Sequence, residues 1–153
     1  MTLTRTELRS WIKLARGMKA LLDALDRQLR EKAGMSHDDY LILSRLHREA
    51  GRKMRMSDLA AEVGFSPSRL SHAVRRLEEE RWVQRTPSAT DRRGVEAALT
   101  EAGVHRLREV SPAHLGQVKR LIFETLGPDH ARETADAIDQ IGRAATVDGY
   151  QPT

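Results

Sequence analysis

Ser66 and Pro67 fix where one helix of this chain begins, and two β-prone runs follow that helix. A serine at the cap position accepts a hydrogen bond from a free amide, and proline suits the first turn because the amide it lacks would be unpaired there. The runs, 83–86 and 95–99, alternate inward and outward side chains, and residues 87–94 join them and end in Asp-Arg-Arg-Gly. A helix followed by an arginine-tipped hairpin favours a DNA-binding surface.

The chain ahead of this helix predicts three short elements. Ser36 begins a helix that Gly51 ends, and residues 54–56 form a short strand. Ser57 then caps a second short helix, which stops at Gly64. The next helix begins two residues later, a spacing typical of a helix-turn-helix.

The helix that Ser66 begins is amphipathic. Leu70, Val74 and Leu77 form an apolar stripe with Ala73 beside it, so small and basic side chains point away from the core. Serines permit close approach to the DNA backbone, and arginine or histidine can donate to phosphates and guanine edges. The alternative is a solvated helix face whose charge is incidental. The residues predicted to contact DNA are Ser66, Ser68, Arg69, Ser71, His72, Arg75 and Arg76.

The tip of the hairpin carries two arginines beside Asp91. An arginine there can enter the minor groove, where negative potential is concentrated, and the carboxylate can hold that guanidinium or cap the turn. We therefore expect Asp91 to orient the tip; the alternative is an ordinary charged loop. The candidate DNA-binding residues of this hairpin are Arg85, Ser88, Asp91, Arg92 and Arg93.

Positive charge is concentrated around these two elements. The chain has 26 Lys plus Arg against 22 Asp plus Glu, and 21 of the 26 are Arg, a bias that a GC-rich genome also produces. Residues 66–93 hold seven Arg and one His against four acids, whereas the rest of the chain is closer to balanced. The placement of the charge favours nucleic acid as the partner.

Long amphipathic helices flank this region. Residues 1–34 predict one helix, begun by Thr4 or Thr6 and followed by Gly34, with a length of roughly 40 Å. A helix of this length is longer than a small domain needs for its own core, so we expect a second copy of the chain to cover it. The alternative is a helix that lies on its own protomer. Its apolar stripe is Leu8, Trp11, Ile12, Ala15, Met18, Leu22, Leu25 and Leu29.

Residues 101–148 predict matching apolar helices. Ser111-Pro112 marks a kink or a restart, and residues 127–129 mark a break. Small residues in the last helix allow close approach of another helix, although alanine is also simply a good helix former. We expect these helices and the first helix to form a dimer interface.

The stretch 57–103, which includes SPSRLSHAVRRLEEERWVQR and TDRRGVEAALTEAG, resembles the winged helix-turn-helix of the MarR family of bacterial transcriptional regulators. Asp91 and Arg93 match the family's Asp-x-Arg wing signature, and Leu99-Thr100-x-x-Gly103 matches its strand-to-helix exit. Arg81 departs from the family, which usually has glycine there. The arginine must take a left-handed conformation at a cost of about 1 kcal/mol or let the helix end differently.

The resemblance implies a mainly α fold with a small β-hairpin wing, as a single domain over 1–153. Residues 1–34 and 101–148 would be the N- and C-terminal dimerisation helices, and 36–100 the winged helix-turn-helix DNA-binding lobe. It also implies a homodimer that lays recognition helices in the major groove and wings in the minor groove of a near-palindromic operator. Such a protein would be a repressor released by a small-molecule effector; the alternative is a ligand-independent or architectural DNA-binding protein of the same fold.

Ligand pockets in the MarR family lie between the dimerisation helices and the DNA-binding lobe. A small aromatic or phenolic effector is the expected class. Urate is not expected, because the urate-responsive subgroup has an acid and an arginine where this chain has Leu41 and Ala73. Trp11 and Met18 fit a pocket, but a place in the dimer core suits them better. The candidate pocket residues are Trp11, Met18, Tyr40 and Arg52.

Several function classes are not expected. The chain has no cysteine, which excludes disulfides, thiol redox switches and cysteine metal ligands. It has no nucleophile elbow, phosphate-binding glycine loop or His-Glu zinc motif, so we expect neither an enzyme nor a bound cofactor or metal. No uncharged run approaches the roughly 20 residues that span a bilayer, so we expect a cytoplasmic protein with no membrane partner.

Overall fold

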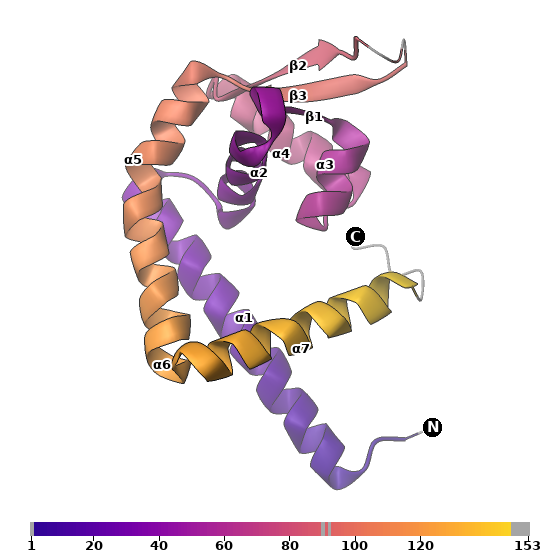
Figure 1. The fold of residues 1–153 in the computed structure, drawn as a ribbon, viewed down its shortest axis with the longest axis vertical. Coiled ribbons are helices and arrows are strands. Elements are labelled where there is room, and N and C mark those ends of the chain that lie inside the picture. Colours follow the sequence, from indigo (N-terminus) through magenta and orange to yellow (C-terminus); the bar gives the residue numbers. More distant parts are fainter. Residues whose placement is uncertain (1, 90, 92, 148–153) are drawn as a thin grey trace.

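The computed structural model describes residues 2–89, 91 and 93–147, and these residues are mainly helical (Figure 1). Arg92, a predicted wing residue, lies outside the described residues. The helical elements are α1 (Arg5–Ala33), α2 (His37–Arg48), the 3-10 turn η1 (Ala50–Arg52), α3 (Met56–Val63), α4 (Pro67–Glu79), α5 (Glu101–Val118), the π-helical segment η2 (Lys119–Phe123), α6 (Glu124–Leu126) and α7 (Pro128–Val147). The strands are β1 (Lys53–Arg55), β2 (Val83–Pro87) and β3 (Val95–Leu99).

Helix α1 begins and ends where the sequence predicts. The Thr4 hydroxyl accepts a hydrogen bond from the Glu7 amide (3.2 Å), and the Glu7 carboxylate accepts one from the Thr4 amide (2.7 Å). This reciprocal capping box fixes the first turn. Gly34 takes a left-handed φ of 63° and its amide donates to the Arg30 carbonyl, which closes the last turn.

Three predicted boundaries around the helix-turn-helix are wrong. Helix α2 ends at Arg48, before the predicted stop at Gly51, which instead has a φ of 70° inside η1. Strand β1 runs directly into α3, so Arg55 and not Ser57 is the N-cap of that helix. Strand β1 also ends one residue before the predicted strand does, because Met56 already belongs to α3.

The three strands form one antiparallel sheet in the order β1-β3-β2. Met54 of β1 lies opposite Ala97 of β3, and Val83 of β2 lies opposite Leu99 of β3. The predicted β-hairpin is therefore confirmed, with β3 in the middle of the sheet. The β2–β3 hairpin projects beyond β1 and beyond the helices next to it (Figure 1).

One hydrophobic core unites the region 36–100, which we call the lobe. Leu43 of α2, Leu59 of α3 and Val74 of α4 all have 0% exposure. Leu29 of α1 and Val104 of α5 belong to the same core, so both flanking helices are anchored to the lobe at the ends nearest to it.

Helices α1 and α5 extend away from the lobe (Figure 1). The flanking helices leave apolar side chains exposed. Helix α5 is continuous through Pro112, so the chain does not restart there, whereas Gly127, with a φ of 76°, does separate α6 from α7 as predicted. Within the described residues, no helix is both long and apolar enough to cross a bilayer. The exposed apolar residues include Leu8, Trp11, Ile12 and Leu22 of α1, Phe123 of η2 and Ile141 of α7.

Candidate nucleic-acid interface

Helix α4 has the start that the sequence predicts. The Ser66 hydroxyl accepts a hydrogen bond from the Arg69 amide (3.2 Å), and Pro67 is the first helical residue. Ser66 is thus engaged in capping the helix. At the other end Arg81 has a φ of 60°, so the chain takes the left-handed conformation at this position without a glycine.

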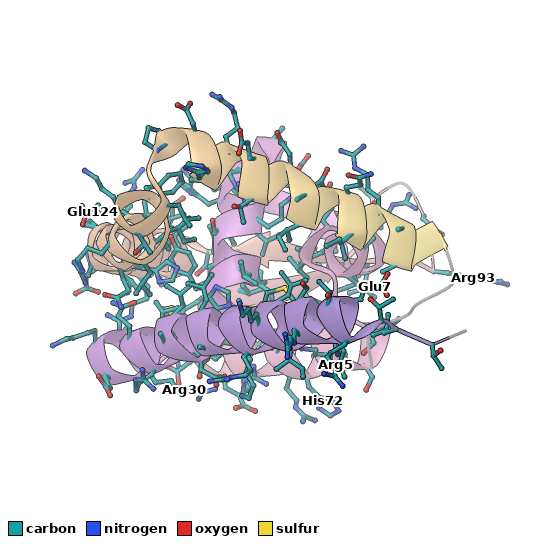
Figure 2. All side chains as sticks on the ribbon, turned by 90° about the horizontal axis from the view of Figure 1, so that it is seen from below. Arg5, Glu7, Arg30, His72, Arg93 and Glu124 are labelled. Atoms are coloured by element: carbon teal, nitrogen blue, oxygen red, sulfur yellow. The ribbon has the colours of Figure 1, made fainter. Side chains whose placement is uncertain are left out.

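One face of α4 is buried and the opposite face is exposed. Leu70, Ala73, Val74 and Leu77 are each at most 1% exposed, which confirms the predicted apolar stripe. The side chain of His72 points away from the body of the molecule (Figure 2). Its Nδ1 lies 3.0 Å from a terminal guanidinium nitrogen of Arg75. The exposed strip consists of Ser68, Ser71, His72 and Arg75.

Two other predicted contacts, Arg69 and Arg76, lie on one flank of α4 and pair with the first turn of α2. Arg69 donates three hydrogen bonds of 2.9–3.0 Å to the carboxylate of Asp38. Its guanidinium also lies 4.2 Å from the centre of the Phe65 ring. Arg76 donates to Oδ1 of Asp39 at 2.9 Å. Sequence reasoning missed both aspartates as partners of this helix.

The wing tip is ordered by Asp91. Its Oδ1 accepts a hydrogen bond from the Arg93 amide (3.0 Å), and its backbone carbonyl accepts one from the Gly94 amide (2.9 Å). The Ser88 amide donates to the Gly94 carbonyl (2.8 Å), which closes the hairpin, and Ser88 itself is only 9% exposed. Asp91 therefore caps the turn, one of the two roles expected for it, while its Oδ2 lies 3.5 Å from the guanidinium of Arg55. The side chain of Arg93 extends away from the protein (Figure 2).

Arg85 lies near the base of the wing and connects β2 to α4. Its guanidinium donates two hydrogen bonds to Oε2 of Glu78, at 2.6 and 2.9 Å, and its amide donates to Oε1 at 3.0 Å. These bonds from Arg85 hold the pKa of the Glu78 carboxyl below its usual value. In this conformation the guanidinium of Arg85 is therefore occupied by its hydrogen bonds to Glu78.

A cleft of about 910 Å³ lies between α1 and the lobe. Asp26 and Arg30 contribute from α1, and Phe65 from the turn between α3 and α4. The two ion pairs between α2 and α4 also line it. In the described part of the chain, no group of three or more His, Asp or Glu side chains is placed to hold a metal ion.

The four residues predicted to line an effector pocket are not among those that line this cleft. Trp11 and Met18 are 54% and 37% exposed on α1. Tyr40 is buried, with its hydroxyl 3.3 Å from that of Ser111, and Arg52 pairs with Glu101 at 2.8 Å. The structure does not bring the four side chains together in one protomer.

Comparison with known proteins places this arrangement in a family. A model of the MarR family matches residues 33–94. The chain is 37% identical to Sco3205, a MarR family transcriptional regulator from Streptomyces coelicolor whose structure was solved in complex with DNA; the match covers 100% of this chain and 93% of that one, with a TM-score of 0.85. It is 36% identical to AbsC, a second MarR family regulator from the same organism, over 98% of this chain and 99% of that one, with a TM-score of 0.87. The transcriptional repressor MprA of Escherichia coli K12 is 29% identical over 92 residues, which are 60% of this chain and 52% of MprA. This chain therefore belongs to the MarR family and is a DNA-binding transcriptional regulator, not an enzyme.

Proposed function

We propose that this protein is a homodimeric repressor that occupies a near-palindromic operator and is released from it by a small-molecule effector. In each protomer, α4 enters the major groove and the β2–β3 wing reaches the minor groove. The observation that carries the proposal is the exposed strip of α4, where Ser68, Ser71, His72 and Arg75 face away from a fully buried apolar stripe. A small, basic helix face of this kind can approach base edges closely.

The wing supplies the second contact. Arg93 extends from a tip whose turn Asp91 caps, so the guanidinium is presented without being buried. A narrow minor groove attracts such a cation. Sco3205, to which this chain is similar over its whole length, was solved with DNA, and MprA is named a repressor.

The homodimer is supported by the apolar surface that one protomer leaves uncovered. Trp11 of α1, Phe123 of η2 and Ile141 of α7 are each at least half exposed. Apolar surface of this extent is typical of a protein interface. On this proposal, residues 1–34 and 101–148 form the dimerisation elements of a single domain, and residues 36–100 form the DNA-binding lobe.

The cleft between α1 and the lobe is the candidate effector site. Arg30, Arg69 and Arg76 could donate to a carboxylate or a phenolate, and Phe65 could stack on an aromatic ring. A ligand-independent DNA-binding or architectural role is the second candidate. It is favoured by the fact that each of these arginines is already paired with an aspartate.

A fluorescence anisotropy titration tests the proposal, with the duplex upstream of the protein's own gene, an unrelated duplex and a series of salt concentrations. We expect the upstream duplex to bind at least tenfold more tightly, and an aromatic acid to weaken that binding. Arg93→Ala should weaken binding several-fold and reduce the salt slope by about one, without changing the dimer measured by light scattering. The exposed Arg108 of α5 provides the matched control, since Arg108→Ala removes the same charge from a residue outside both the strip and the wing. Equal binding to both duplexes would overturn the operator-specific role.

A further inference from the structure

Helix α4 is attached to the rest of the lobe along one flank by two arginines. Arg69 and Arg76 are seven residues apart, which places them two turns apart on the same flank. They pair with consecutive aspartates in the first turn of α2, Asp38 and Asp39. Two anchor points separated along a helix restrict both its rotation about its axis and its tilt.

The anchors themselves are fixed. Oδ2 of Asp39 accepts the Ser36 amide (3.0 Å) as part of the capping box of α2, while Oδ1 binds Arg76. The side chain of Asp39 is only 11% exposed. From α1, Oδ1 of Asp26 accepts the His37 amide (2.9 Å), so the first turn of α2 is also tied to the flanking helix. The orientation of α4 is thereby linked through α2 to α1.

The opposite flank of α4 is attached to the wing. Glu78 accepts three hydrogen bonds from Arg85, two from the guanidinium and one from the amide. The recognition helix is therefore held on both flanks. Ser68, Ser71, His72 and Arg75 are left on its outer face, where Nδ1 of His72 lies 3.0 Å from the guanidinium of Arg75.

We propose that Asp38 and Asp39 are positioning residues of the recognition helix and that Arg69 and Arg76 are its anchors, acting on DNA binding through the orientation of α4. This inference rests on the proposed operator-specific function. Arg69 uses its edge to bind Asp38 and its face to stack on Phe65, so binding a phosphate would require it to give up both contacts. Base readout depends on side chains held to within a fraction of an ångström, so a loosened α4 loses preference for the operator more than general affinity for DNA.

A double-mutant cycle on Asp38 and Arg69 tests the inference. Asp38→Asn, Arg69→Gln and the double variant are titrated against the upstream and unrelated duplexes over a salt series. We expect each single variant to lower the preference for the upstream duplex roughly tenfold, and the double variant to lower it no further, because both changes remove the same contact. The salt slope should stay unchanged. Asp38→Glu keeps the charge and should therefore retain most of the preference for the upstream duplex.

The results that would contradict the positioning role can be told apart from the expected ones. If Arg69 binds a phosphate directly, Arg69→Gln reduces the salt slope by about one on either duplex, and Asp38→Asn strengthens binding by freeing the arginine. Either result, or additive effects in the double variant, overturns the positioning role. The salt slope can be measured on any duplex, so it decides the role of Arg69 even if the wild-type protein has no sequence preference. A lack of sequence preference in the wild-type protein would instead refute the proposed function. Asp139→Asn is the matched control: it makes the same charge change in the exposed pair with Arg143 on α7, and should leave preference unchanged.

Discussion

Among the described residues, Arg52 and Arg81 have a left-handed φ without being glycine, and Arg81 lies at the junction with the wing. Its φ of 60° lies in the left-handed region, which costs a residue with a Cβ about 1 kcal/mol relative to glycine. The position is nonetheless tightly bound into the junction with the wing, because the Arg81 amide donates to the Glu78 carbonyl (2.9 Å) and its own carbonyl accepts the Thr100 hydroxyl (2.7 Å). These bonds support a conformation that the residue itself disfavours.

Arg81→Gly should therefore raise the free energy of unfolding, by about 0.5–1 kcal/mol after the extra freedom of glycine in the unfolded chain is counted. Urea denaturation measures this change. Arg81→Ala is the control, since it removes the same side chain but keeps the Cβ. Equal stability of the alanine and glycine variants would show that the backbone at this position is not strained.

Local roles of residues were predictable, and roles that depend on distant partners were not. Ser66 as a cap and Asp91 as a turn residue follow from short-range hydrogen-bonding rules. Asp38 and Arg69 are 31 positions apart, and no short-range rule connects them. The sequence marked Arg69 as basic and exposed, which is correct, but only the packing of α2 against α4 reveals what its guanidinium binds.

At the scale of elements, the junction between the wing and α5 depends on one glycine. A Cβ on Gly103 would lie 2.2 Å from the Trp82 carbonyl oxygen and 2.7 Å from Cδ1 of Leu99. The carbonyl oxygen of Trp82 belongs to the backbone, so either the start of α5 or the turn between α4 and β2 would have to move. Thr100 strengthens the same junction, because its hydroxyl accepts the Gly103 amide (3.0 Å) and its amide donates to the Trp82 carbonyl (3.0 Å).

We predict that Gly103→Ala costs about 1–3 kcal/mol of stability and changes the angle of the wing. Thermal denaturation measures the first effect, and weaker operator binding by the folded variant reports the second. Gly116→Ala in the same helix is the control: the nearest atom to its new Cβ is 3.9 Å away, so better helix propensity should stabilise the protein by up to about 1 kcal/mol. A neutral Gly103→Ala would mean that the junction can relax without loss.

Several element boundaries were predicted correctly from a cap or a glycine, although Gly51 does not end α2. Thr4, Gly34 and Gly64 are examples, and all three carry the predicted role. The prediction was wrong where elements run together: Ser57 is a good capping residue, but β1 leads straight into α3 and gives Arg55 that position. Pro112 was read as a possible restart, yet α5 is continuous there. In both cases the arrangement of neighbouring elements outweighs the local preference.

At the scale of the whole molecule, a buried histidine joins the flanking helices to the lobe. His114 of α5 is 3% exposed, and its Nδ1 lies 3.2 Å from Oε1 of Gln28 of α1. From α2, the rings of Tyr40 and His37 lie 4.2 and 5.9 Å away between centroids. The histidines were visible in the sequence, but the contact between these three helices was not predictable. Gln28 and His114, for example, are 86 positions apart in the chain.

Burial of this junction should make stability depend on pH. Burial, with a smaller effect from the charge of His37, lowers the pKa of His114 below its usual 6.5. Burial also lowers the pKa of His37, although Asp38 and Asp26 oppose that shift. A depressed histidine pKa means that the unfolded chain binds protons more readily, so stability is lost as the pH falls below about 6.5. Asp26, Glu62 and Glu78, whose pKa values are also lowered, act only at more acidic pH.

We therefore predict that His114→Gln flattens the fall in the free energy of unfolding between about pH 7 and pH 5, where one proton contributes at most about 1.4 kcal/mol per pH unit. Glutamine keeps a side-chain amide that can bind Gln28, and the slope with pH, not the absolute stability, is the readout. His130→Gln, on the exposed surface of α7, should leave the slope unchanged. If the two variants follow the same pH profile as the wild-type protein, the acid sensitivity does not arise from His114, and the junction of α1, α2 and α5 tolerates its protonation.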